Sequence, residues 1–399
     1  TDNNGNVSTC DATITVEDNV NPTAVAQNLT VQLDASGAGS ITAAQANNNS
    51  TDACGIASLA LNQTDFDCSH VGANTVTLSA TDNNGNIGTT TFTVTVEDNV
   101  NPTAVAQNLT VQLDASGAAT ITGAQADNGS SDACGIASLV PSKTTYGCAD
   151  VGTPSTVTLT VTDNNSNVST ATFTVTVEDN VNPTAVAQNL TVQLDASGAG
   201  SITAAQANNN STDACGIASL ALNQTDFDCS HVGANTVTLS ATDNNGNIGT
   251  TTFTVTVEDN VNPTAVAQNL TVQLDASGAA TITGAQADNG SSDACGIASL
   301  VPSKTTYGCA DVGTPSTVTL TVTDNNSNVS TATFTVTVED NVSPTAVCQN
   351  LTIQLDAAGA ASITAAQVND ASSDACGIAS MSLSQTDFDC THIGANSVT

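Results

Sequence analysis

The sequence has 399 residues, 37 of them Asp or Glu and only 2 of them Lys or Arg, which gives a formal net charge of −35 at pH 7. This charge excludes nucleic acid and anionic membrane surfaces as partners, because phosphate contacts require cations. Aromatic residues make up 2% of the chain, Trp is absent, and no apolar run is long enough to insert into a membrane.

One small repeat fills the chain. Residues 19–179 are identical to residues 180–340, and each copy contains two similar halves of 80 and 81 residues. Many near-copies suit a function that scales with length rather than a single catalytic site. Since the chain starts and stops inside a repeat, we expect it to be a window of a longer array. The expected domains are the last strand of a preceding Ig-like repeat (1–18), repeat A1 (19–98), repeat B1 (99–179), repeat A2 (180–259), repeat B2 (260–340) and an incomplete following repeat (341–399).

The first half of repeat A1 predicts short strands and turns. Ala24 to Leu33 alternates with period two and ends at a turn over residues 34–37. Residues 40–44 read as a strand, although Ala43 to Ala46 equally suit one helical turn.

The second half of the repeat predicts two hairpins. Residues 56–61 and 64–68 form the first, with a turn near Asn62. Residues 75–80 and 91–96 form the second, through the Asp/Asn/Gly-rich turn after residue 81. Six or seven short strands predict an all-β tandem array of antiparallel immunoglobulin-like sandwiches, about 80 residues each and placed end to end.

Ten of the 12 cysteines recur as pairs with 13 residues between the partners. No CxxC cluster suggests zinc, so we expect disulfides. Each pair flanks the predicted first hairpin, and we expect a bond across its open end, worth about 3 kcal/mol in the chain-entropy model. The pairs are Cys54/Cys68, Cys134/Cys148, Cys215/Cys229, Cys295/Cys309 and Cys376/Cys390.

Two further cysteines are unpaired by this rule. Cys10 aligns with Thr90 on the last strand of a repeat, and Cys348 aligns with Ala26 on the first strand. We expect some repeats to carry a second bridge between first and last strand. The partners of both residues are then expected outside this stretch of sequence.

Several strings carry a family resemblance. Residues 131–138 (SDACGIAS), 64–68 (TDFDC), 156–159 (TVTL) and 162–165 (TDNN) resemble the HYR-type immunoglobulin-like repeats of very large bacterial cell-surface and secreted proteins. The resemblance covers every repeat. It implies an extracellular location at the bacterial surface and an adhesive or scaffolding role.

The boundary between repeats, which we call the seam, is similar to a cadherin linker. Val96 to Pro102 is acidic, Asn-rich and ends in proline, although Val100 stands where a second acid is usual. The resemblance implies bound calcium, which takes six to eight oxygen ligands. We expect the turn bearing Asp82 and the loop bearing Asp52 to approach the same seam.

The predicted ligands, all rich in oxygen, lie at or near the seams. They are Glu17, Asp18, Asn19, Asn21, Asp82, Glu97, Asp98, Asn99, Asn101, Asp163, Glu178, Asp179, Asn180, Asn182, Glu258, Asp259, Asn260, Asn262, Glu339 and Asp340. The alternative is that Asp, Asn and Pro serve only as turn formers.

Nothing in the sequence predicts an enzyme. His70, His231 and His392 occur only in A-type repeats, and no Ser-His-Asp arrangement recurs in the B type. We predict no catalytic residues and no organic cofactor.

The repetition predicts a structural role. We expect the shaft or stalk of a surface filament, stiffened by calcium and associating with copies of itself in a bundle. Residues 59–67 of A1 differ most from their B1 counterparts 139–147, which contain Pro141, typical of an edge strand. The alternative is an adhesin whose repeats bind a glycan or the surface of another cell.

Overall fold

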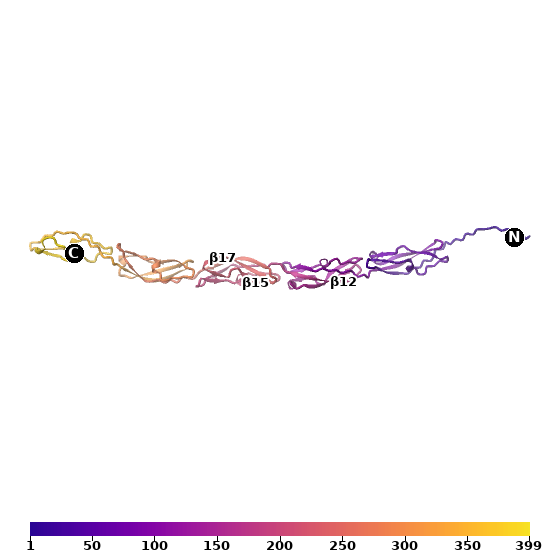
Figure 1. Cartoon of the computed structure of the whole chain (residues 1–399), viewed down its shortest axis with the longest axis horizontal. Coiled ribbons are helices and arrows are strands. Elements are labelled where there is room, and N and C mark those ends of the chain that lie inside the picture. The colour runs from indigo at the N-terminus through magenta and orange to yellow at the C-terminus, as the bar shows by residue number, and fades with distance from the viewer. The chain divides into compact units, whose positions relative to one another are not determined.

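The computed structural model describes all 399 residues, and its regular structure is almost entirely β (Figure 1). The chain divides into two compact units. The first comprises Thr1–Pro183, Thr212–Ala218 and Thr242–Ile248, and the second comprises Thr184–Ser211, Ser219–Ala241 and Gly249–Thr399.

The same elements recur in each repeat. In A1 they are β1 (Leu29–Gln32), β2 (Ala38–Ser40), α1 (Ala43–Ala46), β3 (Ile56–Leu61), β4 (Asp65–Asp67), the 3₁₀ turn η1 (Cys68–His70), β5 (Gly72–Asp82) and β6 (Ile87–Glu97). In B1 they are β7 (Leu109–Gln112), β8 (Ala118–Thr120), α2 (Gly123–Ala126), β9 (Ile136–Pro141), β10 (Thr145–Gly147), η2 (Cys148–Asp150), β11 (Ser155–Asp163) and β12 (Val168–Glu178).

The remaining elements follow the same order. In A2 they are β13 (Leu190–Gln193), β14 (Ala199–Ser201), α3 (Ala204–Ala207), β15 (Ile217–Leu222), β16 (Asp226–Asp228), η3 (Cys229–His231), β17 (Gly233–Asp243) and β18 (Ile248–Glu258). In B2 they are β19 (Leu270–Gln273), β20 (Ala279–Thr281), α4 (Gly284–Ala287), β21 (Ile297–Pro302), β22 (Thr306–Gly308), η4 (Cys309–Asp311), β23 (Ser316–Asp324) and β24 (Val329–Glu339). The last segment holds β25 (Ala360–Ser362), α5 (Ala365–Val368), β26 (Asp387–Asp389) and η5 (Cys390–His392).

Each complete repeat is a two-sheet sandwich. In A1 a four-stranded sheet in the order β1-β6-β5-β3 lies with a two-stranded sheet of β2 and β4, and the other repeats have the same order. The predicted all-β, immunoglobulin-like class is confirmed. One pair departs from the antiparallel expectation, because β1 runs parallel to β6, with Leu29 opposite Val94. This parallel pairing lets the chain enter a repeat at one end and leave it at the other.

The core of each repeat comes from the period-two alternation. Val76, Leu78 and Val94 are fully buried, and Phe92 and Phe66 are nearly so. The inward face predicted for residues 76–80 and 92–96 is therefore confirmed. The outward Thr positions of the same strands stay partly exposed, as expected for a sheet with one wet face.

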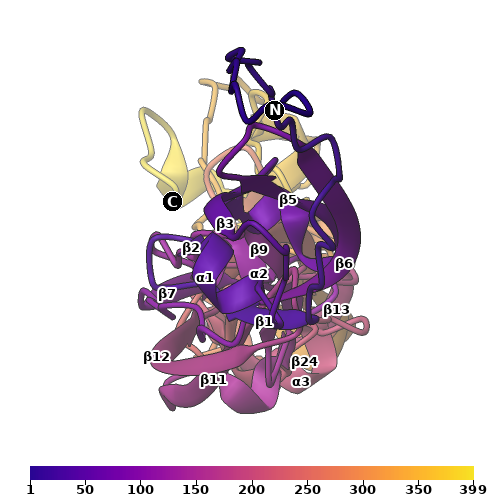
Figure 2. The same ribbon diagram turned by 90° about the vertical axis from the view of Figure 1, so that its right-hand side faces the viewer.

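The helical alternative for residues 43–46 is the one that forms. Thr42 caps α1 with a reciprocal bond to Gln45, which satisfies two donors at the start of the turn. Figure 2 shows α1 beside β3, which it contacts. No helix in the structure is long and apolar enough to span a membrane.

The predicted hairpin over residues 56–68 is wrong. β3 pairs with β5 in one sheet, whereas β4 pairs with β2 in the other. The chain therefore crosses between the sheets near Asn62, whose side chain accepts from the Thr77 N–H. Alternation identified both strands, but it carries no information about which strand is the partner.

Candidate metal centre

Each seam gathers two carboxylates and one cysteine. One aspartate comes from the seam motif, and the other comes from the loop before the first cysteine of the following repeat. Their candidate ligand atoms lie within 4.8 Å of one another. The five sets are Asp18/Asp52/Cys54, Asp98/Asp132/Cys134, Asp179/Asp213/Cys215, Asp259/Asp293/Cys295 and Asp340/Asp374/Cys376.

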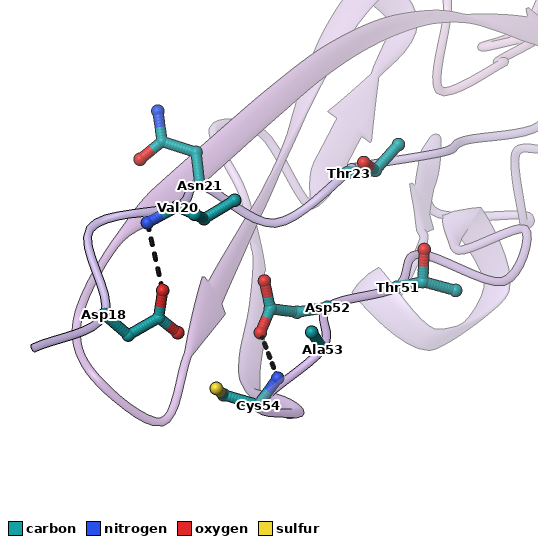
Figure 3. Close-up of a pocket in the computed structure, with 8 residues that line it drawn as sticks. All are labelled: Asp18, Val20, Asn21, Thr23, Thr51, Asp52, Ala53 and Cys54. Atoms are coloured by element: carbon teal, nitrogen blue, oxygen red, sulfur yellow. Dashed lines mark hydrogen bonds between the residues drawn. The ribbon is translucent and has the colours of Figure 1, made fainter. Parts of the chain in front are cut away.

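The first seam shows how the chain aims these groups. The Val20 N–H donates to Asp18 Oδ1 at 3.0 Å, and the Cys54 N–H donates to Asp52 Oδ1 at 2.7 Å. Each carboxylate is thereby fixed through one oxygen by its own local turn. Figure 3 shows both carboxylates and the Cys54 sulfur directed into the same hollow.

The next seam buries its first carboxylate. Asp98 is 6% exposed, and its Oδ1 accepts from the Val100 N–H at 3.1 Å. Its Oδ2 is buried without a hydrogen-bond partner, as are the same atoms of Asp179 and Asp259. A buried polar atom left unpaired costs about 1–3 kcal/mol, and more when the group is charged.

The chain's own cations do not neutralise these carboxylates. Lys143 bonds to Asp150 and Lys304 to Asp311, in both cases within a B-type repeat. The unpaired Oδ2 of Asp98 and the neighbouring Asp132 carboxylate therefore share a site of strong negative charge. Such a set of hard oxygen donors suits a hard cation such as calcium.

The turn of the following repeat is anchored at the same seam. Asn167 donates from Nδ2 to the backbone oxygen of Asp98 at 3.0 Å, and Asn164 donates to the backbone oxygen of Cys134 at 2.7 Å. The sequence placed this turn and the loop of Asp132 at the seam, and the structure brings both there. These two side-chain hydrogen bonds attach the backbone beside Asp98 and Asp132 to the same turn.

Asp163, in that turn, has no free oxygen. Its Oδ1 accepts from the N–H groups of Asn165 and Asn167, each at 2.8 Å, and its Oδ2 accepts from Asn167 Nδ2 at 2.8 Å. Asp82 has the same bonds to Asn84 and Asn86. These aspartates close their own turns, so the structure gives them a role that needs no ion.

The seam glutamates are also engaged. Gln32 Nε2 donates to Glu97 Oε2 at 2.6 Å, and Asn99 Nδ2 donates to Gln32 Oε1 at 2.5 Å. Asn101 is exposed. The glutamates and amides at the other complete seams repeat these roles. Of the predicted ligands, the structure brings into the carboxylate groups only the seam aspartates, and their partner aspartates were not among the predicted ligands; these partners are Asp52, Asp132, Asp213, Asp293 and Asp374.

The cysteines join different repeats, and the pairing expected within each hairpin is wrong. The bonds are Cys68–Cys134, Cys148–Cys215, Cys229–Cys295 and Cys309–Cys376. The physical reason is the sheet crossover: β3 and β4 diverge, so the two cysteines of a pair lie at opposite ends of the repeat. Cys10, Cys54, Cys348 and Cys390 are free, exposed thiols.

Each cystine packs beside the carboxylate pair. Cys134 Sγ belongs to the Asp98/Asp132 group, so the disulfide lines one side of the candidate site. At the first seam, where Cys54 is a thiol, a hydrogen bond to Asp18 and the charge of that carboxylate raise the pKa of the thiol. A cystine sulfur carries no charge, so the carboxylates repel it less than they would repel a thiolate at the same position.

A glycine makes room for each cystine. Gly117 has φ +74°, and a Cβ there would lie 2.8 Å from Cys148 Sγ and 3.0 Å from Ala214 Cβ. Both the left-handed backbone and the lack of space require glycine at this position. The sequence shows a recurrent Asp-Ala-Ser-Gly turn, but it does not reveal that the glycine of this turn contacts the next repeat.

The histidines of the A-type repeats are local caps. His70 Nδ1 lies 2.7 Å from Asp67 Oδ1; Asp67 ends β4 and caps the 3₁₀ turn η1, to which His70 belongs. In B1 the corresponding turn is held by Lys143, which bonds Asp150 and lies 4.6 Å from the centre of the Tyr146 ring. The A and B types thus use different chemistry for the same turn.

No protein-family model and no curated protein matches this sequence. Among solved structures, the protocadherin γB4 extracellular domain is 13% identical, with 85% of this chain and 70% of that chain covered and a TM-score of 0.28. Drosophila N-cadherin EC1-4 is 11% identical (78% and 98% covered, TM-score 0.25), and Sidekick-1 immunoglobulin domains 1–5 are 11% identical (80% and 81% covered, TM-score 0.26). At these scores the fold assignment rests on the strand order and register described above.

Proposed function

We propose that this chain is a structural repeat region of a very long extracellular protein, forming the shaft or stalk of a surface filament. The observation that carries the proposal is the cystine between consecutive repeats, found at four successive places. Disulfides persist in oxidising, extracellular surroundings. The bacterial cell surface as the location rests on the HYR-type resemblance of the repeats.

The seam carboxylates add a cation to this proposal. We assign calcium to the paired carboxylates Asp98 and Asp132 and to their equivalents at the other seams. Support comes from the unpaired, buried Oδ2 of Asp98 and the absence of a basic side chain beside it. This set differs from the sequence expectation in two ways. It adds Asp132, which was not among the predicted ligands, and it leaves out Asp163 and Glu97, whose carboxylates already have partners in the chain.

A bound cation would offset the cost of the buried charge and hold the two sides of the seam together. Asp98 belongs to the seam, whereas Asp132 belongs to the following sandwich. An ion that binds both carboxylates fixes their positions relative to each other, and it stabilises the folded state by mass action. Calcium therefore acts here as a structural stiffener.

Calcium binding and chain dimensions test this function together. Titration calorimetry of the intact chain is expected to show binding that Asp132→Asn weakens, and small-angle scattering is expected to show a longer maximum dimension with calcium than with a chelator. The exposed-turn variant Asp114→Asn is the control and should bind as the parent does, since Asp114 bonds only its own turn. Unchanged binding in Asp132→Asn would contradict the site.

Self-association completes the proposal. Strands β1 and β3 are both edges of the larger sheet, and β9, the B1 equivalent of β3, carries Pro141 at its end. Open edges are surfaces on which a second chain can pair or pack. Sedimentation of the chain with calcium is expected to show multi-chain species at high concentration, and electron microscopy of the native material should show fibres of more than one chain. A monomer under all these conditions would favour a single stalk.

A further inference from the structure

The cystines create a covalent route along the chain that bypasses most of each repeat. From Cys134 the chain reaches Cys148 after 13 intervening residues, and Cys148 is then bonded to Cys215. The remaining residues, between Cys148 and Cys215, form a loop closed by the disulfide. The same route repeats through residues 215–229 and 295–309. We call these 15-residue stretches the bridging segments.

Each bridging segment runs from one end of its repeat to the other. Ile136, at its start, pairs with Asp163 in the turn that bonds to the Asp98 seam. Cys148, at its end, is bonded to Cys215, which lies in the Asp179 group at the next seam. The crossover between sheets is what allows β9 and β10 to continue in one direction instead of folding back as a hairpin.

The bridging segment has little slack. Fully extended, its 15 residues reach roughly 50 Å. It already spans a sandwich whose strand β12 has 11 residues, about 36 Å at the rise of an extended strand. The disulfide adds 5.1 Å between Cα atoms. By contrast, the whole 81-residue repeat would extend to roughly 290 Å if it unfolded.

We propose that the bridging segments and inter-repeat cystines form a continuous load-bearing strap, which keeps the closed loops of about 66 residues off the path of an applied force. Tension between distant points of the array passes through Cys68–Cys134, the bridging segment, Cys148–Cys215 and so on. Strands β11 and β12, which supply most of the B1 core, lie inside the closed loop. The strap limits extension even if a sandwich opens.

The residues that distinguish the A and B repeats lie on or against the strap. In B1 the Lys143–Asp150 pair and the Tyr146 ring hold its second half, and in A2 Asp228 and His231 do so. This inference rests on the inter-repeat cystines that also carry the proposed function, and it is independent of calcium. Its failure in a stretching experiment would leave the proposed calcium site untouched.

Single-molecule stretching of the intact chain from its two ends, in chelator, tests the strap. The reduced chain is expected to release four additional lengths of about 240 Å each, one for every closed loop. Oxidised Cys68→Ser/Cys134→Ser should release one such length, whereas Cys10→Ser/Cys348→Ser, which removes free thiols, should release none. Steps of this size in the oxidised parent chain would overturn the strap.

A second measurement needs no variant and no folded protein. The five glutamates, Glu17, Glu97, Glu178, Glu258 and Glu339, stand one at each seam. After denaturation without reducing agent, a glutamate-specific protease is expected to leave residues 18–399 as one disulfide-linked species, which on reduction separates into the fragments 18–97, 98–178, 179–258, 259–339 and 340–399. Free fragments before reduction would place the disulfides within repeats and overturn the strap.

Discussion

Two aspartates at the same seam, Asp98 and Asp163, are both buried and yet differ in how completely their carboxylates are hydrogen-bonded. Asp163 is 1% exposed and accepts three hydrogen bonds from its own turn. Asp98 is 6% exposed and leaves Oδ2 without a partner. A buried carboxylate with complete bonds is part of the fold, whereas one with an unpaired oxygen requires something the chain does not supply.

The difference follows from sequence spacing. In Asp163-x-Asn165-x-Asn167 the backbone N–H groups two and four residues after the acid, together with the side-chain amide of Asn167, all donate to the Asp163 carboxylate. Asp98 is followed by Val100 and Pro102, so only one N–H reaches its carboxylate. The Asp/Asn turn that looks most like a metal loop is thus the one that is already satisfied.

The largest expected effect is the loss of the satisfied aspartate. Asp163→Ala removes three hydrogen bonds to a charged acceptor and leaves buried N–H groups unpaired, at a cost of about 3 kcal/mol or more. At about 4–8 °C per kcal/mol for a domain of this size, repeat B1 should melt more than 10 °C lower. Calorimetry should show this shift equally in calcium and in chelator.

Repeat B2 is the internal control, because it has the same sequence as B1 and keeps its own aspartate, Asp324. The melting temperature of B1 should fall, whereas that of B2 should stay unchanged. A shift that appears only in calcium would make Asp163 a ligand and erase the distinction from Asp98.

A smaller effect, with the opposite dependence on calcium, is expected for Asp98→Asn. The amide keeps the bond from the Val100 N–H and removes an uncompensated buried charge that faces Asp132. In chelator the variant should be as stable as the parent or more stable, by about 1–3 kcal/mol. In calcium the parent should gain stability and the variant should not.

The measurement is the melting temperature of repeat B1 with and without calcium. The identical seam at Asp259 serves as the reference within the same chain. Equal gains from calcium at both seams would show that the Asp98 carboxylate does not take part in binding.

The sequence was sufficient to predict the strands and the seam, but not which strands pair or which cysteines are bonded. Alternation gave the buried faces, such as Val94 and Leu78, because a half-buried strand must alternate. It also placed the turn of Asp163 near Asp98, because strand direction fixes which turns meet at one end. Both are properties of local pattern and chain direction.

Pairing between segments is a non-local property, and there the prediction failed. Cys54 and Cys68 looked like a pair because they are close in sequence, yet Cys68 bonds Cys134. Identical spacing in every repeat fits bonds within a repeat and bonds between repeats equally well. The crossover near Asn62 decides the matter, and no local pattern records it.

The smallest expected effect concerns acid. Burial alone would raise the pKa of Asp243, but hydrogen bonds from Asn247, Asn245 and Gly246 outweigh it and hold the pKa below its usual range. A carboxyl whose pKa is lowered in the folded state contributes stability above its unfolded pKa, about 3.9, and loses it as the pH falls toward the folded value. The A2 repeat should therefore lose stability progressively below pH ~4. Melting temperatures measured between pH 5 and pH 2 should fall less steeply in Asp243→Asn than in the parent chain, since the substituted side chain no longer binds a proton on unfolding. Identical slopes would mean that the closed Asp/Asn turn draws no stability from its charge, and the contrast with Asp98 would then lie in hydrogen-bond geometry alone.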